Sequence, residues 1–511
     1  MKAIYSVIFI VLILFSCKKS SEDKAEAICA FKEQEITLGD QAGKGTFTIA
    51  WSHTEWELST LSSGFISNFS YLKGGSTDHS NTTRVTFDYS ANTMADERLQ
   101  EVFLTNKVTG EKTKLTIKQS NQPPVEIAVD PAVLYQQITG FGGMNNVWAA
   151  GFLTVEEVQK MYSPDGLGYN MMRIMIYPNK NDWGRDVATT LKAQSLGARI
   201  LATPWTPPAA MKSSNSTLHG HLLPEKYADY VKHLNDFIDF MKDKGITIEA
   251  VSIQNEPDWS PEYDGCEWTP EQILDFVKNH AGGIKAKVVA AEAVNFKKMY
   301  TDPVLNDPLA VNNLDIAGGH LYGGGLADYP LARAKGKEIW MTEHLLNDEK
   351  DNFGLGWDQA LVFGKELNDC MKANFNAYFW WYLKRSYSML GDGDKGTVTG
   401  EILKRGYVMS HFAKFATGRT RVQAGSVNGN NNVHVTAYKG AQDLTLIIIN
   451  QGMQPVPSIK INLPEPVKDA SAIETSENQN MVSKNVTLSE DKKSATIGLP
   501  AKSIVSLRLS K

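Results

Sequence analysis

The chain of 511 residues is poor in cysteine, having only Cys17, Cys29, Cys266 and Cys370, and no two of these form a Cys-x-x-Cys pair. Neither a disulfide framework nor a zinc site is therefore indicated. Basic residues are not in excess, because the formal net charge is -5, and no nucleic-acid partner is expected. The sequence contains no motif typical of a metal or cofactor site, so we expect neither. A composition of 42% hydrophobic and 21% charged residues predicts a globular protein of two or three domains.

Long apolar runs are absent apart from residues 4–15, and this run is too short to cross a bilayer as a helix. With Lys2 before it, the segment 1–16 is typical of an export signal. Cys17 follows directly, as in the cleavage box of bacterial lipoproteins, which predicts a lipid anchor on Cys17 and a polar tether over 17–28. We then expect an outer-membrane lipoprotein exposed at the cell surface. The alternative is an ordinary secretory signal that ends in a buried cysteine.

Residues 29–121 contain short alternating segments separated by polar turns, which predicts a small β-sandwich. Trp56, Arg98 and the closing segment 117–120 resemble the BACON domain, a module found in front of carbohydrate-active enzymes of gut Bacteroidetes. That resemblance implies sugar binding. We instead favour a spacer that separates the catalytic part from the membrane, with Trp51 and Trp56 in the core.

A boundary is expected near residue 122, where Pro123 and Pro124 interrupt any strand. Over 122–417 apolar segments alternate with amphipathic helices, which favours a closed (β/α)₈ barrel over an open doubly wound sheet, because no Gly-rich phosphate motif follows the first strand. The predicted strands are 138–143, 171–178, 198–205, 249–256, 287–294, 314–322, 338–344 and 377–383. The predicted helices are 186–196, 225–244, 270–286, 358–372 and 406–415.

Alternation returns over 418–511 and predicts a second β-sandwich beside the barrel. The segment 125–137, which precedes the first barrel strand, can supply one more strand to this side domain. The predicted fold is therefore multidomain, with a small N-terminal sandwich, a TIM barrel and a C-terminal sandwich.

Two carboxylates stand at the ends of apolar runs, Glu256 after Asn255 and Glu343 after Thr342. Active sites of such barrels are built at the C-terminal ends of the strands. A buried glutamate requires a partner or a function, and a structural salt bridge is the alternative for either residue alone. Two at equivalent places predict a catalytic pair.

The chain from Ile138 onward resembles glycoside hydrolase family 30, whose members are retaining (β/α)₈ glycosidases. The resemblance implies that Glu256 is the acid/base and Glu343 the nucleophile, about 5 to 5.5 Å apart. The matching segments are Gly140-Phe141-Gly142-Gly143-Met144-Asn145, Met172-Arg173-Ile174, Thr203-Pro204-Trp205-Thr206-Pro207-Pro208, Gln254-Asn255-Glu256-Pro257, His320-Leu321-Tyr322, Trp340-Met341-Thr342-Glu343-His344, Trp380-Trp381-Tyr382 and Lys404-Arg405-Gly406-Tyr407.

Several further residues are expected to hold the sugar. Asn255 is expected to bind the 2-hydroxyl, and Arg173 and Tyr322 to orient the nucleophile, although a barrel-core ion pair is the alternative for Arg173. Four tryptophans offer flat faces for sugar rings, with one of the adjacent pair Trp380 and Trp381 expected to point into the outer helices. These four are Trp148, Trp205, Trp268 and Trp380.

The segment 380–387 resembles the loop of the glucuronoxylanase branch of family 30, where an arginine binds the carboxylate of a glucuronic acid side group. By position this arginine is Arg385, assisted by Tyr387, and a planar guanidinium suits a carboxylate. A surface ion pair is the alternative for Arg385. Lys384, Ser388 and Leu345 depart from the pattern of that branch.

We therefore predict a monomeric, retaining endo-β-1,4-xylanase that acts on glucuronoxylan through Arg385. The alternatives are a family 30 hydrolase of another β-glycan, such as β-1,6-glucan or undecorated xylan, and a non-catalytic surface glycan-binding protein.

Overall fold

The computed structural model describes residues 26–60, 64–92, 94, 96–121, 125–147, 151–346, 355–427 and 430–511. The predicted signal segment, Cys17 and the tether as far as residue 25 lie outside these ranges. No helix within the described ranges is long and apolar enough to cross a membrane. The chain forms two compact units, Met1–Gln122 and Pro123–Lys511.

Within its described residues, the first unit has seven strands whose alternating side chains enclose one core. Its strands are β1 (Ile28–Phe31), β2 (Glu35–Leu38), β3 (Gly43–Thr60), β4 (Ile66–Ser67), β5 (Lys73–Tyr89), β6 (Arg98–Asn106) and β7 (Lys112–Gln119). The long strand β3 pairs with β1, β5 and β6, and nearly every second side chain along it is buried. Trp51 and Trp56 both lie in the core, so neither indole ring offers an exposed platform to a sugar.

Eight parallel strands of the second unit close into a barrel in the order β10, β11, β12, β13, β14, β15, β16, β9. This confirms the predicted (β/α)₈ barrel. The strands are β9 (Gly140–Met144), β10 (Met171–Ile176), β11 (Arg199–Pro204), β12 (Ile248–Ser252), β13 (Lys287–Ala293), β14 (Ile316–His320), β15 (Glu338–Glu343) and β16 (Ala377–Trp380).

The helices around the barrel begin at recognisable signals. The N-cap residues Thr154 and Thr269 each form a capping box with a Glu or Gln three residues later, and Pro270 occupies the first turn of its helix. The helix predicted over 270–286 ends at Asn279, because Gly282 and Gly283 follow in a tight turn. The helices are α1 (Val155–Tyr162), α2 (Val187–Ser195), α3 (Tyr227–Asp243), α4 (Pro270–Asn279), α5 (Asp302–Asn306), α6 (Pro330–Ala334), α7 (Gly356–Lys372) and α8 (Lys404–Ala416).

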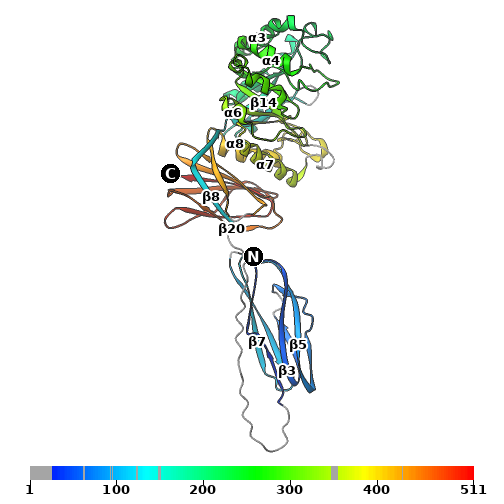
Figure 1. The fold of residues 1–511 in the computed structure, drawn as a ribbon, viewed down its shortest axis with the longest axis vertical. Helices are drawn as coiled ribbons and strands as arrows, with labels where there is room; N and C mark the ends of the chain where they lie inside the picture. The colour runs from blue at the N-terminus through cyan, green and yellow to red at the C-terminus, as the bar shows by residue number, and fades with distance from the viewer. Residues whose placement is uncertain are drawn as a thin grey trace, which may run out of the picture. The chain divides into compact units, whose positions relative to one another are not determined.

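The C-terminal strands enclose a separate apolar core and include β8 (Val125–Gln137), which precedes the barrel in sequence. β8 pairs with β17 on one side and β20 on the other, and Figure 1 shows this cyan strand among the orange and red ones. The C-terminal strands are β17 (Thr420–Ser426), β18 (Val433–Lys439), β19 (Asp443–Asn450), β20 (Val456–Asn462), β21 (Asp469–Ser476), β22 (Gln479–Lys484), β23 (Thr487–Leu488), β24 (Ser494–Leu499) and β25 (Ser503–Ser510).

Helices α7 and α8 connect the barrel to this side domain. The indole nitrogen of Trp357 donates a hydrogen bond to the carbonyl of Lys502 at 2.7 Å. The buried His411 ring lies between two side-domain hydroxyls, Ser506 Oγ at 2.8 Å and Thr475 Oγ1 at 2.9 Å. Barrel and side domain therefore share buried polar contacts as well as apolar ones.

Candidate active site

Side chains fill the barrel interior in layers. Because every second residue of a strand points to the same face, the residues two and four positions further along a strand form the next layers. Met171 and Ile316 belong to a buried apolar cluster at one level of the interior. Two residues after Met171 the same face of β10 presents Arg173, and four residues after Ile316 the same face of β14 presents His320. Both polar side chains are fully buried, Arg173 in the middle of β10 and His320 at the C-terminal end of β14.

Glu256 lies four residues beyond the end of β12, which stops at Ser252 rather than continuing to Glu256 as predicted. Its backbone has a positive φ of 46°, a conformation that costs a non-glycine residue about 1 kcal/mol or more. Two backbone hydrogen bonds hold this turn, from Glu256 N–H to the Glu292 carbonyl at 3.2 Å and from Asn255 N–H to the Pro204 carbonyl at 2.9 Å. The surrounding strands thus fix the direction of the Glu256 side chain.

Glu343 is the last residue of β15, and each of its carboxylate oxygens has a donor. The Tyr322 hydroxyl donates to Oε1 at 2.8 Å, and Arg173 Nη1 contacts Oε2 at 2.5 Å. The carboxylate therefore has one fixed orientation. Arg173 and Tyr322 occupy the places expected of orienting residues, and Arg173 at the same time forms a buried ion pair.

The spacing of the two carboxylates defines the reaction they can perform. One oxygen of Glu256 and one of Glu343 lie within 4.8 Å of each other. This agrees with the separation of about 5 to 5.5 Å in retaining glycosidases, and it leaves no room for the water that inverting enzymes hold across about 6.5 to 9.5 Å. Both side chains line a cavity of about 650 Å³.

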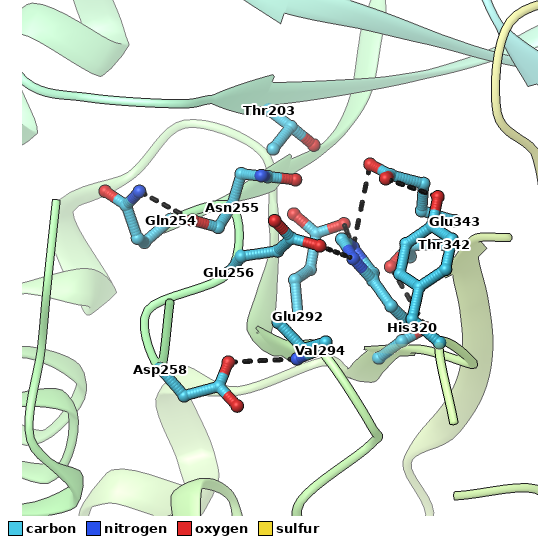
Figure 2. A network of polar contacts seen from close by, with 12 residues as sticks. Thr203, Gln254, Asn255, Glu256, Asp258, Glu292, Val294, His320, Thr342 and Glu343 are labelled. Carbon is cyan, nitrogen blue, oxygen red and sulfur yellow. Dashed lines mark hydrogen bonds and ion pairs between the residues drawn. The ribbon is translucent and has the colours of Figure 1, made fainter. Parts of the chain in front are cut away.

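A third carboxylate, Glu292 at the end of β13, belongs to the site but was not among the predicted residues. Its side chain is fully buried, 3.2 Å from Arg173 Nη2 and 3.7 Å from His320 Nε2. His320, quoted only as part of a motif, places Nδ1 3.0 Å from Glu256 Oε1. Figure 2 shows the Glu256, Glu292 and Glu343 carboxylates converging on the His320 ring.

The charges of this group follow from their neighbours. Burial opposes ionisation of Glu292, but Arg173 and His320 outweigh it and hold its pKa at about 2. Burial also opposes the imidazolium form of His320, yet Glu343, Glu256 and Glu292 raise its pKa to about 9. Burial and the Glu343 charge raise the pKa of Glu256, against the hydrogen bond from His320. Glu256 therefore takes up a proton more readily than Glu292.

Asn255 lies between the chemistry and the position of the sugar. Its Oδ1 accepts a hydrogen bond from Arg173 Nη2 at 2.6 Å, which assigns the amide orientation and turns Nδ2 away from the arginine. The guanidinium Nε of Arg173 also donates to Thr203 Oγ1 at 3.2 Å. Arg173 is therefore shared between the nucleophile and the residue predicted to hold the 2-hydroxyl.

The aromatic residues of the cavity differ in part from those predicted. Trp205 lines it, with the Arg173 guanidinium 4.7 Å from one indole face. Trp381 also lines it, with its ring centroid 5.8 Å from that of Trp205 and 4.1 Å from that of Tyr382. Trp259 and Tyr263 add two partly exposed rings from the loop after β12. The cavity thus has apolar walls with polar groups at its base, as a sugar site requires.

Two predicted tryptophans do not contribute to this surface. Trp380 is fully buried, with its ring edge-on to Phe363 of α7 at 4.9 Å and the Arg405 guanidinium 4.7 Å from its face. Trp268 is stacked on Tyr227 of α3 at 5.8 Å and is 3% exposed. The expectation that these two rings bind sugar is therefore wrong, because each packs between strands and outer helices. Trp148 lies outside the described residues.

Arg385 lies beside the cavity wall, with its guanidinium 5.9 Å from the ring of Tyr382. Its Nη1 is 3.5 Å from Asp392 Oδ2, and its side chain interacts with the hydroxyl of Tyr387. Burial raises the pKa of Tyr387, although Arg385 acts against this. The structure thus brings Arg385 and Tyr387 together and adds Asp392, which was not among the predicted residues.

Lys384, one of the departures from the family pattern, points away from the cavity. Its ammonium group is buried against Glu157 of α1, with Nζ to Oε2 at 2.9 Å, and donates to the carbonyl of Phe152 at 2.8 Å. Its backbone is held by the amide of Asn146. Lys384 anchors the base of the Arg385 loop. A lysine at this position, where the glucuronoxylanase branch has an arginine, therefore does not change the lining of the cavity.

Three side chains could in principle hold a metal ion, because Glu256, His320 and Glu343 each place a potential ligand atom within 4.8 Å of the others. A metal-bound histidine must be neutral. The carboxylates around His320 raise its pKa to about 9 and so favour the imidazolium, which has no lone pair to give. The arrangement suits proton transfer better than metal binding.

A closed (β/α)₈ barrel with two facing carboxylates at retaining distance in an aromatic cavity defines a glycoside hydrolase. No protein-family model matches the sequence. The chain is 39% identical over 338 residues to glucuronoxylanase XynC of Bacillus subtilis, which covers 64% of this chain and 78% of that protein.

Solved structures give the same class. A xylanase of glycoside hydrolase family 30 subfamily 8 from Clostridium acetobutylicum is 34% identical, with a TM-score of 0.69 over 76% of this chain and 100% of that one. An endoxylanase of the same family from Clostridium papyrosolvens is also 34% identical, with a TM-score of 0.66 and the same coverage. The chain therefore belongs to glycoside hydrolase family 30. An endo-β1,6-glucanase at 20% identity and a TM-score of 0.60 shares the fold.

Proposed function

We propose that the protein is a retaining endo-β-1,4-xylanase that cuts glucuronoxylan at positions set by a glucuronosyl side group. The observation that carries the reaction type is the Glu256 and Glu343 pair, with oxygens within 4.8 Å in the cavity. The xylan substrate is supported by the relatives of known specificity. A catalytically silent glycan-binding protein would have no need for a strained, buried acid beside an oriented nucleophile.

In the first step Glu343 attacks the anomeric carbon while Glu256 gives its proton to the departing glycosidic oxygen. A covalent bond forms between Glu343 and the sugar, and the bond to the leaving chain breaks. Arg173 and Tyr322 hold the attacking carboxylate in one orientation, which reduces the entropy lost on reaching the transition state. Asn255 Nδ2 is the group turned toward the 2-hydroxyl, where a hydrogen bond can strengthen in the transition state.

In the second step Glu256, now a carboxylate, takes a proton from water, and that water attacks the anomeric carbon. The bond to Glu343 breaks, and the product has the configuration of the substrate. Glu256 must therefore be an acid in one step and a base in the next. A pKa raised by burial and by Glu343, yet restrained by the contact with His320, suits both roles.

The side-group specificity is assigned to Arg385. A uronate carboxylate needs a cation at the edge of the cavity, and a guanidinium supplies one with matching geometry. Arg385 meets this requirement beside Tyr382, a cavity residue, and next to Tyr387. Asp392 already neutralises part of this charge, which favours a second candidate substrate, undecorated xylan, alongside the decorated polymer.

Arg385→Ala is expected to lower kcat/KM on glucuronoxylan about 10- to 100-fold, the effect of losing one charge-assisted hydrogen bond. Activity on undecorated linear xylan should change little. Asp392→Asn should have the opposite effect, a lower KM for the decorated polymer, because the guanidinium loses its internal partner. Initial rates on glucuronoxylan and on linear xylan measure these effects. The positions of the glucuronosyl branches in the products show where the chain was cut.

Arg333→Ala is a suitable control, because Arg333 is exposed and paired with Asp328 on the surface. Equal losses on both polymers in Arg385→Ala would show that Arg385 supports the loop and does not read the side group. Cleavage of β-1,6-glucan in preference to either xylan would overturn the substrate assignment itself.

We further propose that Cys17 carries a lipid anchor in the outer membrane, that the enzyme faces the cell exterior and that it acts as a monomer. The BACON-like first unit then serves as a spacer. The proposal is supported by the apolar run of 4–15 directly before Cys17 and by the burial of Trp51 and Trp56 in the core of that unit.

Cys17→Ala is expected to abolish incorporation of labelled palmitate and to release the protein from the membrane fraction. Labelling followed by fractionation measures both effects. Cys29→Ala is the matched control, because Cys29 is buried in the first unit. The Cys29→Ala protein should incorporate palmitate as the wild type does. Palmitate that persists on the Cys17→Ala protein would rule out this anchor.

A further inference from the structure

Three glutamates and two cations meet beneath the cavity, although the reaction uses only two of the glutamates. Arg173, Glu292 and His320 are fully buried, and Glu256 and Glu343 are each less than 10% exposed. A carboxylate buried this deeply must be matched by positive charge or take up a proton. Glu292 has no contact with the cavity, so its place in the site calls for a role other than binding substrate.

Glu292 contacts the two cations that serve the catalytic pair. Its Oε1 lies 3.2 Å from Arg173 Nη2, and Arg173 Nη1 contacts the nucleophile Glu343. The same oxygen lies 3.7 Å from His320 Nε2, and His320 Nδ1 contacts the acid Glu256 at 3.0 Å. Each path from Glu292 to a catalytic carboxylate therefore passes through a single cation, as Figure 2 shows for His320.

The backbone adds a third connection. Glu292 has a positive φ of 55°, and its carbonyl accepts the N–H of Glu256, whose φ is also positive. Two glutamates in this rare conformation are thus joined directly. Such backbone conformations persist where the surrounding structure over-determines them, which is frequent at active sites.

We propose that Glu292 is a positioning residue for the hydrolysis: its negative charge holds Arg173 and His320 in place and offsets their positive charge, so that Glu256 keeps its proton in the resting enzyme. The proposal rests on the proposed retaining reaction. It assigns to the third carboxylate a function in the first step, the delivery of the proton to the leaving group.

Charge balance explains how a residue that touches no substrate can act. With Glu256 protonated, the site holds two anions, Glu292 and Glu343, and two cations, Arg173 and His320. If Glu292 becomes neutral, the same proton distribution leaves one uncompensated positive charge in a buried site. The His320 and Glu256 pair must then release a proton at lower pH. The pKa of His320, about 9 beside three carboxylates, agrees with its role as the cation of this pair.

The groups that face this pair come from five parts of the barrel. Arg173 comes from β10, Glu343 from β15, and Glu292 from β13, while two hydroxyls, those of Tyr322 and Tyr263, face the carboxylates from the loops after β14 and β12. Burial and the neighbouring carboxylates raise the pKa of both tyrosines, which therefore remain neutral. The basic limb of the pH profile is then expected to report the His320 and Glu256 pair.

The test is Glu292→Gln, which keeps the shape and removes the charge. We expect kcat/KM on glucuronoxylan to fall about 100-fold, the low end of what general acid catalysis supplies. The 2,4-dinitrophenyl glycoside of a glucuronosyl xylooligosaccharide, whose leaving group needs no proton, should lose less than about 10-fold. The basic limb of the pH profile on the polymer should move at least about one unit lower. Glu292→Asp, which keeps the charge, should recover part of the loss.

Glu249→Gln is the matched control. Glu249 also has a pKa of about 2, set by its hydrogen bond from Arg199 against burial and by Lys287, but it lies at the start of β12, away from the cavity. The Glu249→Gln enzyme should be less stable than the wild type, but the pH profile of its activity should be unchanged. A Glu292→Gln enzyme with the same basic limb as the wild type, or with equal losses on both substrates, would overturn the proposal.

A measurement on the wild type does not depend on the variant folding. Nitrogen-15 NMR of the histidine rings should show an imidazolium that persists through neutral pH and disappears in His320→Asn. A neutral His320 at pH 7 would overturn the proposal. A wild-type enzyme that hydrolyses neither the polymer nor the activated glycoside would instead refute the proposed function, so the two failures can be told apart.

Discussion

Glu343→Gln is expected to lower kcat on glucuronoxylan by about 10⁴-fold or more, because an amide cannot form the covalent bond on which both steps depend. Binding should persist, since the neutral amide preserves the shape of the site. The amide oxygen can still accept the hydrogen bond from the Tyr322 hydroxyl, but the amide has no negative charge to form the ion pair that Arg173 makes with Oε2 of Glu343. Steady-state kinetics and isothermal titration with a xylooligosaccharide separate the two effects.

A smaller replacement at this position gives a stereochemical test. In Glu343→Ala, azide should enter the vacated space and attack the anomeric carbon directly, giving a glycosyl azide of inverted configuration. Glu338→Gln is the control on the same strand, because Glu338 accepts hydrogen bonds from Thr139 and Trp340 at the other end of β15. A Glu343→Gln enzyme that retains more than about 1% of the wild-type turnover would refute its role as nucleophile.

Glu256→Gln is expected to lower kcat/KM on the polymer by about 10³-fold, within the range that general acid catalysis supplies. The loss should depend on the leaving group: formation of the glycosyl-enzyme from a dinitrophenyl glycoside needs no proton and should remain fast. Azide should then rescue Glu256→Ala with retention of configuration, the opposite of its effect in Glu343→Ala. Product configuration by NMR therefore assigns each glutamate to its step.

The pH dependence follows from the same residue. Burial and Glu343 raise the pKa of Glu256, so its acid form persists to a higher pH than that of a free glutamic acid. Activity of the wild type should fall as pH rises through this value, because the proton for the leaving group is lost. This basic limb should be absent in Glu256→Ala on the activated glycoside. Its persistence there would assign the limb to another group.

The barrel and the catalytic pair could be predicted because their signals are local. Apolar runs alternate with amphipathic segments at the strand and helix periods, and Glu256 and Glu343 stand out as charges directly after apolar runs. The short helices α1, α5 and α6 were missed, since five to eight residues give too little periodicity. The end of β12 was misplaced because Ile253 continues the apolar run of the strand, and the turn that holds Glu256 is as buried as the strand itself.

Glu292 carried a usable signal that was overlooked. It is a lone carboxylate in the alanine-rich strand β13, as conspicuous in its context as Glu343 is in β15. What the sequence could not supply is its partners, because Arg173 and His320 are distant in the chain and meet it only in the closed barrel. Trp268 and Trp380 were predicted to bind sugar but are buried. The sequence does not show whether an aromatic residue near a strand end faces the cavity or the outer helices.

The place of β8 in the C-terminal sheet has a consequence for biosynthesis. Its Gln136 accepts a hydrogen bond from Arg421, 285 residues later, and its backbone pairs with strands made only at the end of synthesis. The unit therefore cannot be completed while the ribosome is still producing the barrel, and its completion requires contacts between the two ends of the unit, which are distant in sequence. A chain of this kind reaches its final fold only after its last strands have emerged from the ribosome.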